Sequence, residues 1–244
     1  RRYLLFTAVQ KARVSTEGTK VMSLLSESIG AKGFESDTYF ETALRDAPMI
    51  PILEGSAHIN LKMASQFIPA YFGEADHSLT LPESLFGQGL TAAENPYLFK
   101  ATHNYINTIH FPRFLPASRP LAEIDNVRQF ARQAAGLRRF LFHGCDRDAM
   151  LAETDSSLLL GQCLAIIVYA QLIAENSTAL RVPRPIVSTI FHCLIHDLTA
   201  ALINLAELPR LSTAEHAHLR RLIVVPRPNE ADWDSAAEQA MSEQ

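Results

Sequence analysis

Residues Glu27 to Asn60 read ESIGAKGFESDTYFETALRDAPMIPILEGSAHIN, and the turns in this segment decide how the chain folds. The segment opens as the last turn of a helix that stops at Gly30, because glycine is common just past a helix C-terminus. A compact turn follows, and residues 41–46 resume a helical pattern. Pro48 and Pro51 then predict an extended passage that leads to Glu54 and to the start of another helix.

Glu54 is the chemically distinctive residue of this segment. Its neighbours Ile50, Ile52 and Leu53 are apolar, and an apolar setting raises the pKa of a carboxyl group. Gly55 follows it and leaves room for a substrate, so Glu54 is a candidate general base. Taken alone, a glutamate before a glycine is more often a solvated loop residue.

A long helix is predicted before this segment. Over residues 1–29 the apolar positions recur at steps of three or four, which predicts one amphipathic helix. Gly18 lies inside this pattern and suggests close packing against a neighbour, because glycine costs about 1 kcal/mol relative to alanine in a helix interior. The apolar stripe starts with the first residues, so we expect the polypeptide to extend upstream of Arg1.

The rest of the chain also has helical patterns. Residues 56–71 form the next predicted helix, with Ser56 suited to cap it. Proline and glycine then interrupt short aromatic-rich pieces up to Pro120, which predicts an ordered connector. Five further helices are expected at 121–144, 148–176, 185–208, 213–222 and 229–244. No strand pattern is found, so the sequence predicts an all-α fold in which residues 159–172 pack against the helix at 185–208 in an antiparallel bundle.

Composition excludes several classes of function. The 244 residues carry a net charge of −4, so the chain lacks the general basic surface of a nucleic-acid-binding protein. Its most apolar stretch, residues 158–173, contains two glutamines and is flanked by acids, which favours a buried helix over a transmembrane segment. Three cysteines without a Cys-x-x-Cys pair indicate reduced thiols and a cytoplasmic location.

Two histidine clusters are weaker candidates for chemistry. His192 and His196 are four residues apart on one predicted helix, beside Cys193 and Asp197, which is a metal-ligand spacing. No third ligand is evident, so we expect a core or interface role and no metal. Cys145 lies beside His143, but residues this close in sequence rarely reach the geometry that a nucleophile and its base need.

The motifs around residues 27–60 resemble the C-terminal helical domain of the flavin-dependent acyl-CoA dehydrogenases. In that family an Ala-Lys-Ala helix precedes Gln-Ile-x-Gly-Gly-x-Gly-Tyr/Phe, then Arg-Asp-Ala, then Ile-Tyr-Glu-Gly-Thr-x-x-Ile. The corresponding segments here, in the same order and spacing, are Lys11-Ala12, Glu27 to Phe34, Arg45 to Ala47, and Ile52 to Ile59.

The resemblance implies a domain organisation. Residues 1–75 would be part of the family's C-terminal four-helix bundle, residues 76–120 a connector, and residues 121–244 a helical extension that forms a second bundle. The rest of the dehydrogenase fold would come from an upstream segment or a partner chain. The family's members assemble as homo-oligomers, so a homodimer or tetramer is expected.

The resemblance also implies an activity and its residues. Glu54 matches the base that removes the α-proton of an acyl-CoA in fatty acid metabolism, while the cofactor FAD takes a hydride and passes electrons to an acceptor flavoprotein. Gly55 matches a substrate contact. The remaining matches are to FAD: Glu27, Ser28, Ile29, Gly30 and Ala31 to its adenosine diphosphate half, usually of a neighbouring subunit, and Ser56, Ala57 and His58 to the flavin.

Two departures from the family pattern leave an alternative open. Glu27 replaces an amide and Ala31 replaces a glycine, and a carboxylate near a diphosphate is repelled unless a cation such as Lys32 pairs with it. The alternative is a non-catalytic helical subunit that retains the fold and serves assembly or regulation.

Arg45 and Asp46 are expected to be structural, as an ion pair that ties the loop to the bundle.

Overall fold

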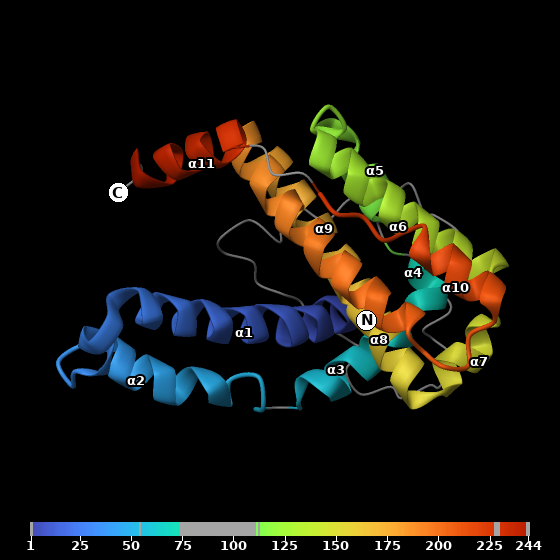
Figure 1. Cartoon of the computed structure of the whole chain (residues 1–244), viewed down its shortest axis with the longest axis horizontal. Coiled ribbons are helices and arrows are strands. Elements are labelled where there is room, and N and C mark those ends of the chain that lie inside the picture. The colour runs from blue at the N-terminus through green and yellow to red at the C-terminus, as the bar shows by residue number, and fades with distance from the viewer. Residues whose placement is uncertain (1, 54, 74–110, 112, 227–229, 243–244) are drawn as a thin grey trace, which may run out of the picture.

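In the computed structural model the protein is a bundle of helices from which one helical hairpin projects (Figure 1). The structure describes residues 2–53, 55–73, 111, 113–226 and 230–242. The elements before residue 74 are α1 (Arg2–Ile29), η1 (Gly30–Phe34), α2 (Tyr39–Asp46), η2 (Ala47–Met49), α3 (Ala57–Ser65) and α4 (Ile68–Phe72). Those after residue 110 are α5 (Phe114–Ala117), η5 (Arg119–Leu121), α6 (Asp125–His143), α7 (Arg147–Ala152), α8 (Thr154–Ala179), α9 (Arg184–Ala206), α10 (Thr213–Arg220) and α11 (Glu230–Ser242). Within these ranges there is no strand, and the all-α prediction is confirmed.

Helices α8 and α9 form the centre of the bundle. A short turn joins them, and α8 also packs against α1, α3 and α5, while α9 packs against α6, α10 and α11. At Gly161 a Cβ atom would lie 2.2 Å from the carbonyl oxygen of Leu61, so only glycine allows α3 to approach α8 this closely. Both central helices are long and apolar enough to cross a membrane, but 67% and 50% of their most apolar windows are buried in the bundle. Core helices of soluble proteins have the same composition, so this is no evidence for a transmembrane segment.

Aromatic side chains join the outer helices to this centre. The rings of Phe114, Phe130 and Phe191 lie 5.0–6.0 Å apart and link α5, α6 and α9. Phe111 packs edge-on against Phe67 at 5.8 Å, which links the residues before α5 to the end of α3. An ordered connector would bury its aromatic residues, and Phe111 and Phe114 are buried, whereas Phe86, Tyr97, Phe99 and Tyr105 lie outside the described residues.

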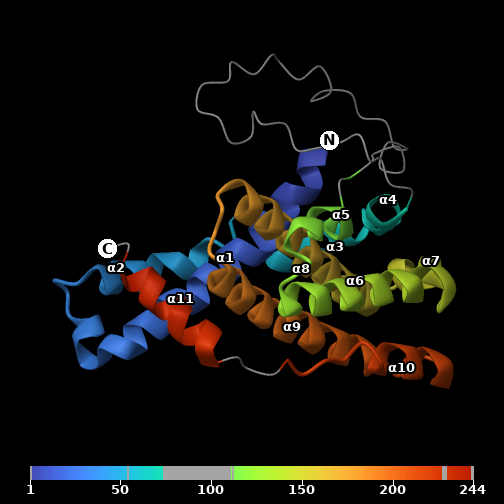
Figure 2. The same cartoon turned by 90° about the horizontal axis from the view of Figure 1, so that it is seen from above.

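The second half of α1 leaves the bundle and pairs with α2 in a hairpin (Figure 2). We call residues 14–53 the α1–α2 hairpin. The first half of α1 is buried through Leu5, Ala8, Val9 and Ala12, whereas Leu24, Leu25 and Ile29 on the same helix are exposed. The apolar stripe predicted for residues 1–29 is therefore covered only at its N-terminal end.

Several predicted details differ from the structure. The passage through Pro48 is not extended: η2 follows α2 directly and a turn follows it, because proline is tolerated in a first helical turn where its missing N–H has no partner. The helix expected at 56–71 breaks after Ser65 into α3 and α4, and the one at 148–176 breaks at Glu153. Gly18 packs against nothing within 4 Å, so its predicted close contact is wrong.

Candidate functional site

The segment expected to meet the FAD diphosphate forms the tip of the α1–α2 hairpin. Gly30 ends α1 with φ +69°, a left-handed conformation that favours glycine. Gly33 packs on the last turn of α1, where a Cβ atom would lie 2.8 Å from the Ser26 hydroxyl oxygen. The positive φ at Gly30 and the close approach of Gly33 to Ser26 therefore both favour glycine at these positions.

The side chains at this tip do not form a binding site for an anion. Glu27, Ser28, Ile29 and Ala31 are all exposed, and the Ser28 hydroxyl donates to the carbonyl of Leu24 at 2.9 Å. The segment follows the C-terminus of α1, whose dipole end is negative. The ion pairs of the described residues do not include Glu27 with Lys32, so the expected neutralisation is not seen.

The segment expected to carry the base lies at the other end of the hairpin. Glu54 itself lies outside the described residues. Gly55 has φ +106°, Ser56 is extended, and α3 begins at Ala57. The predicted cap by the Ser56 side chain is not formed; instead the Asn60 amide donates to the carbonyls of Gly55 at 3.1 Å and Ser56 at 3.0 Å. The Ser56 hydroxyl is therefore not used in capping α3.

The neighbours of this segment are open to solvent. Ile50, Ile52 and Leu53, which were expected to surround the Glu54 carboxylate, are each more than half exposed. His58 is exposed as well, and Ala57 is half-buried. Within this chain the three apolar side chains do not enclose a base, and they could raise its pKa only if another surface covered them.

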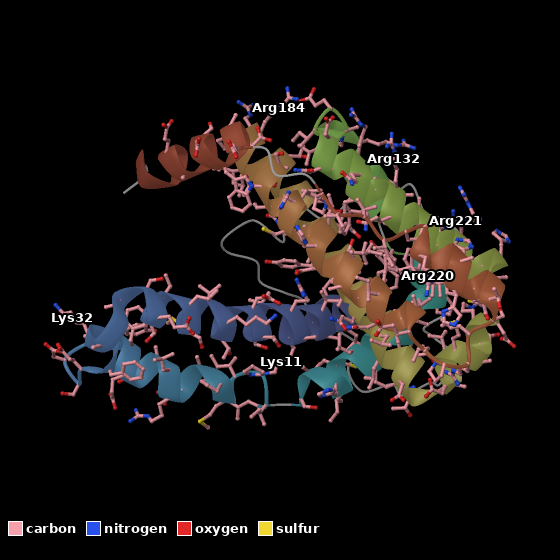
Figure 3. The ribbon with its side chains drawn as sticks, in the orientation of Figure 1. Lys11, Lys32, Arg132, Arg184, Arg220 and Arg221 are labelled. Carbon is pink, nitrogen blue, oxygen red and sulfur yellow. The ribbon has the colours of Figure 1, made fainter. Side chains whose placement is uncertain are left out.

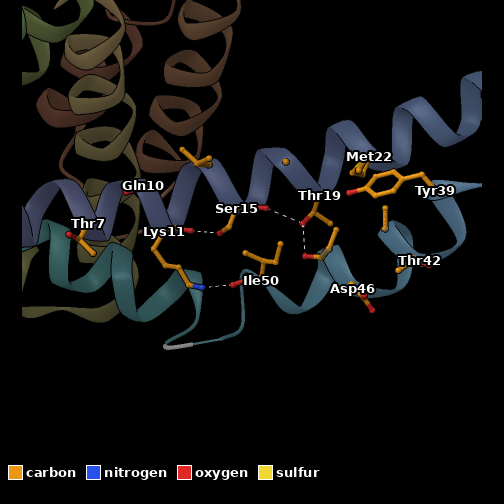
Figure 4. A pocket seen from close by; sticks show the side chains of 14 residues that line it. Thr7, Gln10, Lys11, Ser15, Thr19, Met22, Tyr39, Thr42, Asp46 and Ile50 are labelled. Atoms are coloured by element: carbon orange, nitrogen blue, oxygen red, sulfur yellow. Dashed lines mark hydrogen bonds between the residues drawn. The ribbon is translucent and has the colours of Figure 1, made fainter. Parts of the chain in front are cut away.

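A groove of about 540 Å³ runs between α1 and α2 (Figure 4). Lys11 donates to the carbonyl of Ile50 at one end, and Met22 and Tyr39 line the other. Between them Thr19 donates its hydroxyl either to the carbonyl of Ser15 at 3.0 Å or to that of Ala47 at 3.2 Å. Most of the lining is small or apolar, and none of it comes from residues 27–34 or 52–59.

The two motif segments are far apart. Lys11 marks the bundle end of the hairpin and Lys32 its tip (Figure 3). From Lys11 to Ser26, where Gly33 packs, α1 rises about 22 Å at 1.5 Å per residue. One small ligand group cannot touch both segments of this chain.

The Arg45–Asp46 pair forms within α2. The Arg45 Nε atom lies 3.1 Å from Asp46 Oδ1 and an Arg45 Nη atom 3.8 Å from Glu41, and all three side chains are exposed. The pair therefore does not connect the loop to the bundle, which corrects our expectation. An exposed pair of this kind contributes at most about 1 kcal/mol.

The histidine and cysteine clusters show no catalytic arrangement. The rings of His192 and His196 are 5.0 Å apart, and the His192 ring also packs edge-on against Trp233 at 5.8 Å, between α9 and α11. Burial, and then the charge of His196, lowers the pKa of His192. Burial raises the pKa of the Cys145 thiol to about 12, so it is no activated nucleophile. Across the described ranges no three metal-binding side chains lie together.

Sequence analysis missed two groups of polar side chains in the bundle. The first is a buried chain in which Tyr71 donates to the Gln171 side-chain oxygen at 2.7 Å and Gln171 donates to Glu175 at 2.9 Å. The second is a set of arginines around α5 and α6. Helix α6 contains four arginines and one carboxylate, and this imbalance was the available signal.

Comparisons with family models, with curated proteins and with solved structures found no match to this chain. The resemblance to acyl-CoA dehydrogenases therefore depends on the sequence motifs alone.

Proposed function

We propose that this chain is the C-terminal portion of an FAD-dependent acyl-CoA dehydrogenase, with Glu54 as the base for α,β-dehydrogenation of an acyl-CoA thioester. The observation that carries the proposal is the backbone at Gly55. This motif glycine has φ +106° directly before the extended Ser56 and the start of α3, so it re-aims the chain immediately after Glu54. Gly30, the glycine of the other motif, also has a positive φ, of +69°.

The proposed chemistry assigns separate tasks to adjacent groups. Glu54 would remove the α-proton, and Gly55 would leave room for the thioester beside it. The Ser56 hydroxyl, which α3 does not use, would donate to the flavin or the substrate. When bound, FAD would accept the β-hydrogen as hydride. Because Ile50, Ile52 and Leu53 are exposed, the site would need a cover from outside these 244 residues.

The position of the hairpin tip fits a role in assembly. Residues 27–31 lie about 22 Å along α1 from the base segment, as expected if they touch a cofactor held by a neighbouring subunit. Their exposed side chains and the negative end of α1 do not favour a diphosphate without cations from that neighbour. FAD contact at Glu27, Ser28, Ile29, Gly30 and Ala31 stays a prediction.

A second candidate is the non-catalytic assembly subunit. Two observations favour it: the unneutralised Glu27 at the hairpin tip, and the apolar side chains exposed along the whole hairpin. An assembly subunit would keep the hairpin as a docking element and would not need Glu54.

The experiment uses affinity-tagged chain purified from its own cells together with whatever it binds. The first candidate predicts a yellow complex that acyl-CoA bleaches under anaerobic conditions. Glu54→Gln should keep the colour and slow bleaching by roughly 10²–10⁴, the usual effect of losing a general base. Glu35→Gln, an exposed glutamate of the same hairpin outside the motifs, is the matched control and should bleach at the wild-type rate.

The outcomes separate the two candidates. A colourless complex, confirmed by intact mass, would favour the assembly subunit. A yellow complex in which Glu54→Gln bleaches as fast as the control would remove Glu54 from the mechanism.

A further inference from the structure

Two of the four arginines of α6, Arg138 and Arg139, line one pocket of the bundle, far from the motif segments. The pocket is about 210 Å³ in volume and lies where α5 meets α6. It is lined by three apolar and three basic residues, namely Leu115, Ala135, Phe142, Arg138, Arg139 and His143. Drug-sized ligands need pockets of roughly 300 Å³ or more, so this one suits a small group.

All three basic residues of this pocket are exposed, and one of them, Arg138, is held in place. Arg138 donates through Nε to the carbonyl of Phe72 at 2.9 Å. Its guanidinium carbon lies 5.9 Å from the centre of the Phe142 ring, and that of Arg147 lies 5.0 Å from the same centre. Contact with the aromatic face and the hydrogen bond to Phe72 restrict Arg138, which lowers the entropy cost of binding an anion.

Carboxylates do not neutralise these cations. Over the described ranges no acidic side chain lies within 4 Å of a nitrogen of Arg138, Arg139 or Arg113. Arg113, just before α5, has two buried nitrogens, Nε and Nη2, that find no hydrogen-bond partner among the described residues. Burial, and then the charge of the nearby Arg138, lowers the pKa of Arg113. Uncompensated cations this close together repel one another, and a bound anion would relieve that repulsion.

We propose that the pocket between α5 and α6 binds the phosphate group of a small molecule through Arg138, Arg139 and His143. A doubly charged phosphate matches several cations better than a single carboxylate does, and the guanidinium fork binds phosphate through two parallel hydrogen bonds. The apolar residues Leu115, Ala135 and Phe142 would contact the part of the ligand next to the phosphate. This site does not depend on the proposed dehydrogenase activity.

Isothermal titration of the full chain with sodium pyrophosphate at constant ionic strength tests the proposal. We expect saturable binding, and Arg139→Gln should weaken it about tenfold or more, as expected for a lost charge-assisted hydrogen bond. Arg132→Gln is the matched control, because Arg132 is an exposed arginine of α6 outside the pocket (Figure 3). It should change the affinity less than twofold.

Two results would overturn the proposal. The first is no saturable heat with pyrophosphate at millimolar concentration, although circular dichroism shows a folded chain. The second is equal weakening by Arg139→Gln and Arg132→Gln, because diffuse attraction does not distinguish arginines on one helix.

Vesicles identify the source of the phosphate group. The chain is sedimented with vesicles of phosphatidic acid and phosphatidylcholine and, for comparison, with vesicles of phosphatidylcholine alone. If co-sedimentation requires both phosphatidic acid and Arg139, the bound phosphate group is that of a lipid headgroup. No sedimentation, with pyrophosphate binding intact, supports a free phosphorylated small molecule.

Discussion

The bundle and the α1–α2 hairpin use apolar side chains in opposite ways. In α8 and α9 nearly every apolar side chain on the inner faces is buried, whereas residues 14–53 bury only Ser26, Gly33 and Ala43. Phe34, Tyr39 and Ile52 in the hairpin are at least 70% exposed. Soluble monomers rarely expose a contiguous apolar surface, so the hairpin has the composition of a docking element and the bundle that of a stable core.

This contrast matters for the proposed function, because all candidate dehydrogenase residues lie in the hairpin or at its junction with α3. The bundle would determine the free energy of unfolding of the chain, and the hairpin would determine which ligands or partners the chain binds. Paired substitutions, one in each region, test that division.

The largest difference is expected for phenylalanine. Phe130→Ala removes a fully buried ring that packs between Phe114 and Phe191, and it should lower the free energy of unfolding by about 3–5 kcal/mol. Phe34→Ala removes a ring that is 77% exposed, and it should change the free energy by less than about 0.5 kcal/mol. Urea unfolding followed by circular dichroism measures both. Equal losses would show that the hairpin is part of the core.

A smaller difference is expected for tyrosine. The Tyr71 hydroxyl donates to the Gln171 side chain at 2.7 Å and accepts from the amide of Phe114 at 3.1 Å, and burial is the main reason why its pKa is raised. Tyr71→Phe leaves both partners buried and unpaired, which should cost about 1–3 kcal/mol. Tyr39→Phe, at an exposed ring of the hairpin, is the control and should cost nothing measurable in the same urea experiment. A neutral Tyr71→Phe would mean that water replaces the hydroxyl.

The bundle also contains a carboxylate that should make its stability depend on pH. Glu153 caps α8 by accepting from the amide of Ser156 at 2.8 Å, from its hydroxyl and from the amide of Asp155, and these bonds, with the charge of Arg210, lower its pKa to about 2. Since the folded pKa lies below the ordinary value of 4.5, the stabilisation is complete above pH 4.5 and is lost as pH falls towards 2.

Unfolding midpoints between pH 6 and pH 2.5 test this cap. Glu153→Gln should be less stable than the wild type at neutral pH and should lose less stability on acidification. If the two proteins lost stability in parallel below pH 4.5, Glu153 would not be the group responsible.

The sequence predicted the helices of both regions but not the contacts between them. The helix end at Gly30 was predicted from the glycine, and the end of α9 was predicted at residue 208, two residues beyond Ala206, from the end of the apolar pattern; both signals are local. The break after Ser65 is followed by Pro69 in the first turn of α4, which has no N–H to continue the helix, and the break at Glu153 coincides with the local cap that its side chain gives α8.

The sites were predictable to different degrees. The helix end at Gly30 was expected from the sequence, because glycine is a local signal, whereas the positive φ at Gly55 was not predicted. The exposure of Ile50 and Ile52 was not predicted, because the apolar character of a residue does not determine which part of the fold covers its side chain. The excess of arginine in α6 was a local signal for the basic pocket, but the approach of Arg138 to Arg113, which lies 25 positions earlier, depends on helix packing.

The smallest effects come from two glycines of the hairpin that differ only in backbone conformation. A Cβ atom added at Gly18 or at Gly30 would meet nothing within 4 Å, so neither substitution creates a clash. Gly18 lies within α1, where alanine should stabilise the helix by about 0.5–1 kcal/mol. Gly30 has φ +69°, where alanine should cost about 1 kcal/mol.

Hydrogen exchange of the α1 amides measures both effects, because the exposed half of this helix can open without unfolding the bundle. Gly18→Ala should slow exchange over residues 15–29, Gly30→Ala should speed it, and neither should change the amides of α8. Gly18 also lines the α1–α2 groove, so a partner helix that fills this groove would meet the new methyl group. Gly18→Ala should then stabilise α1 in the free chain and weaken binding of the partner, two opposite effects that would not occur together if nothing bound in the groove. Slower exchange with unchanged association would show that the partner binds elsewhere.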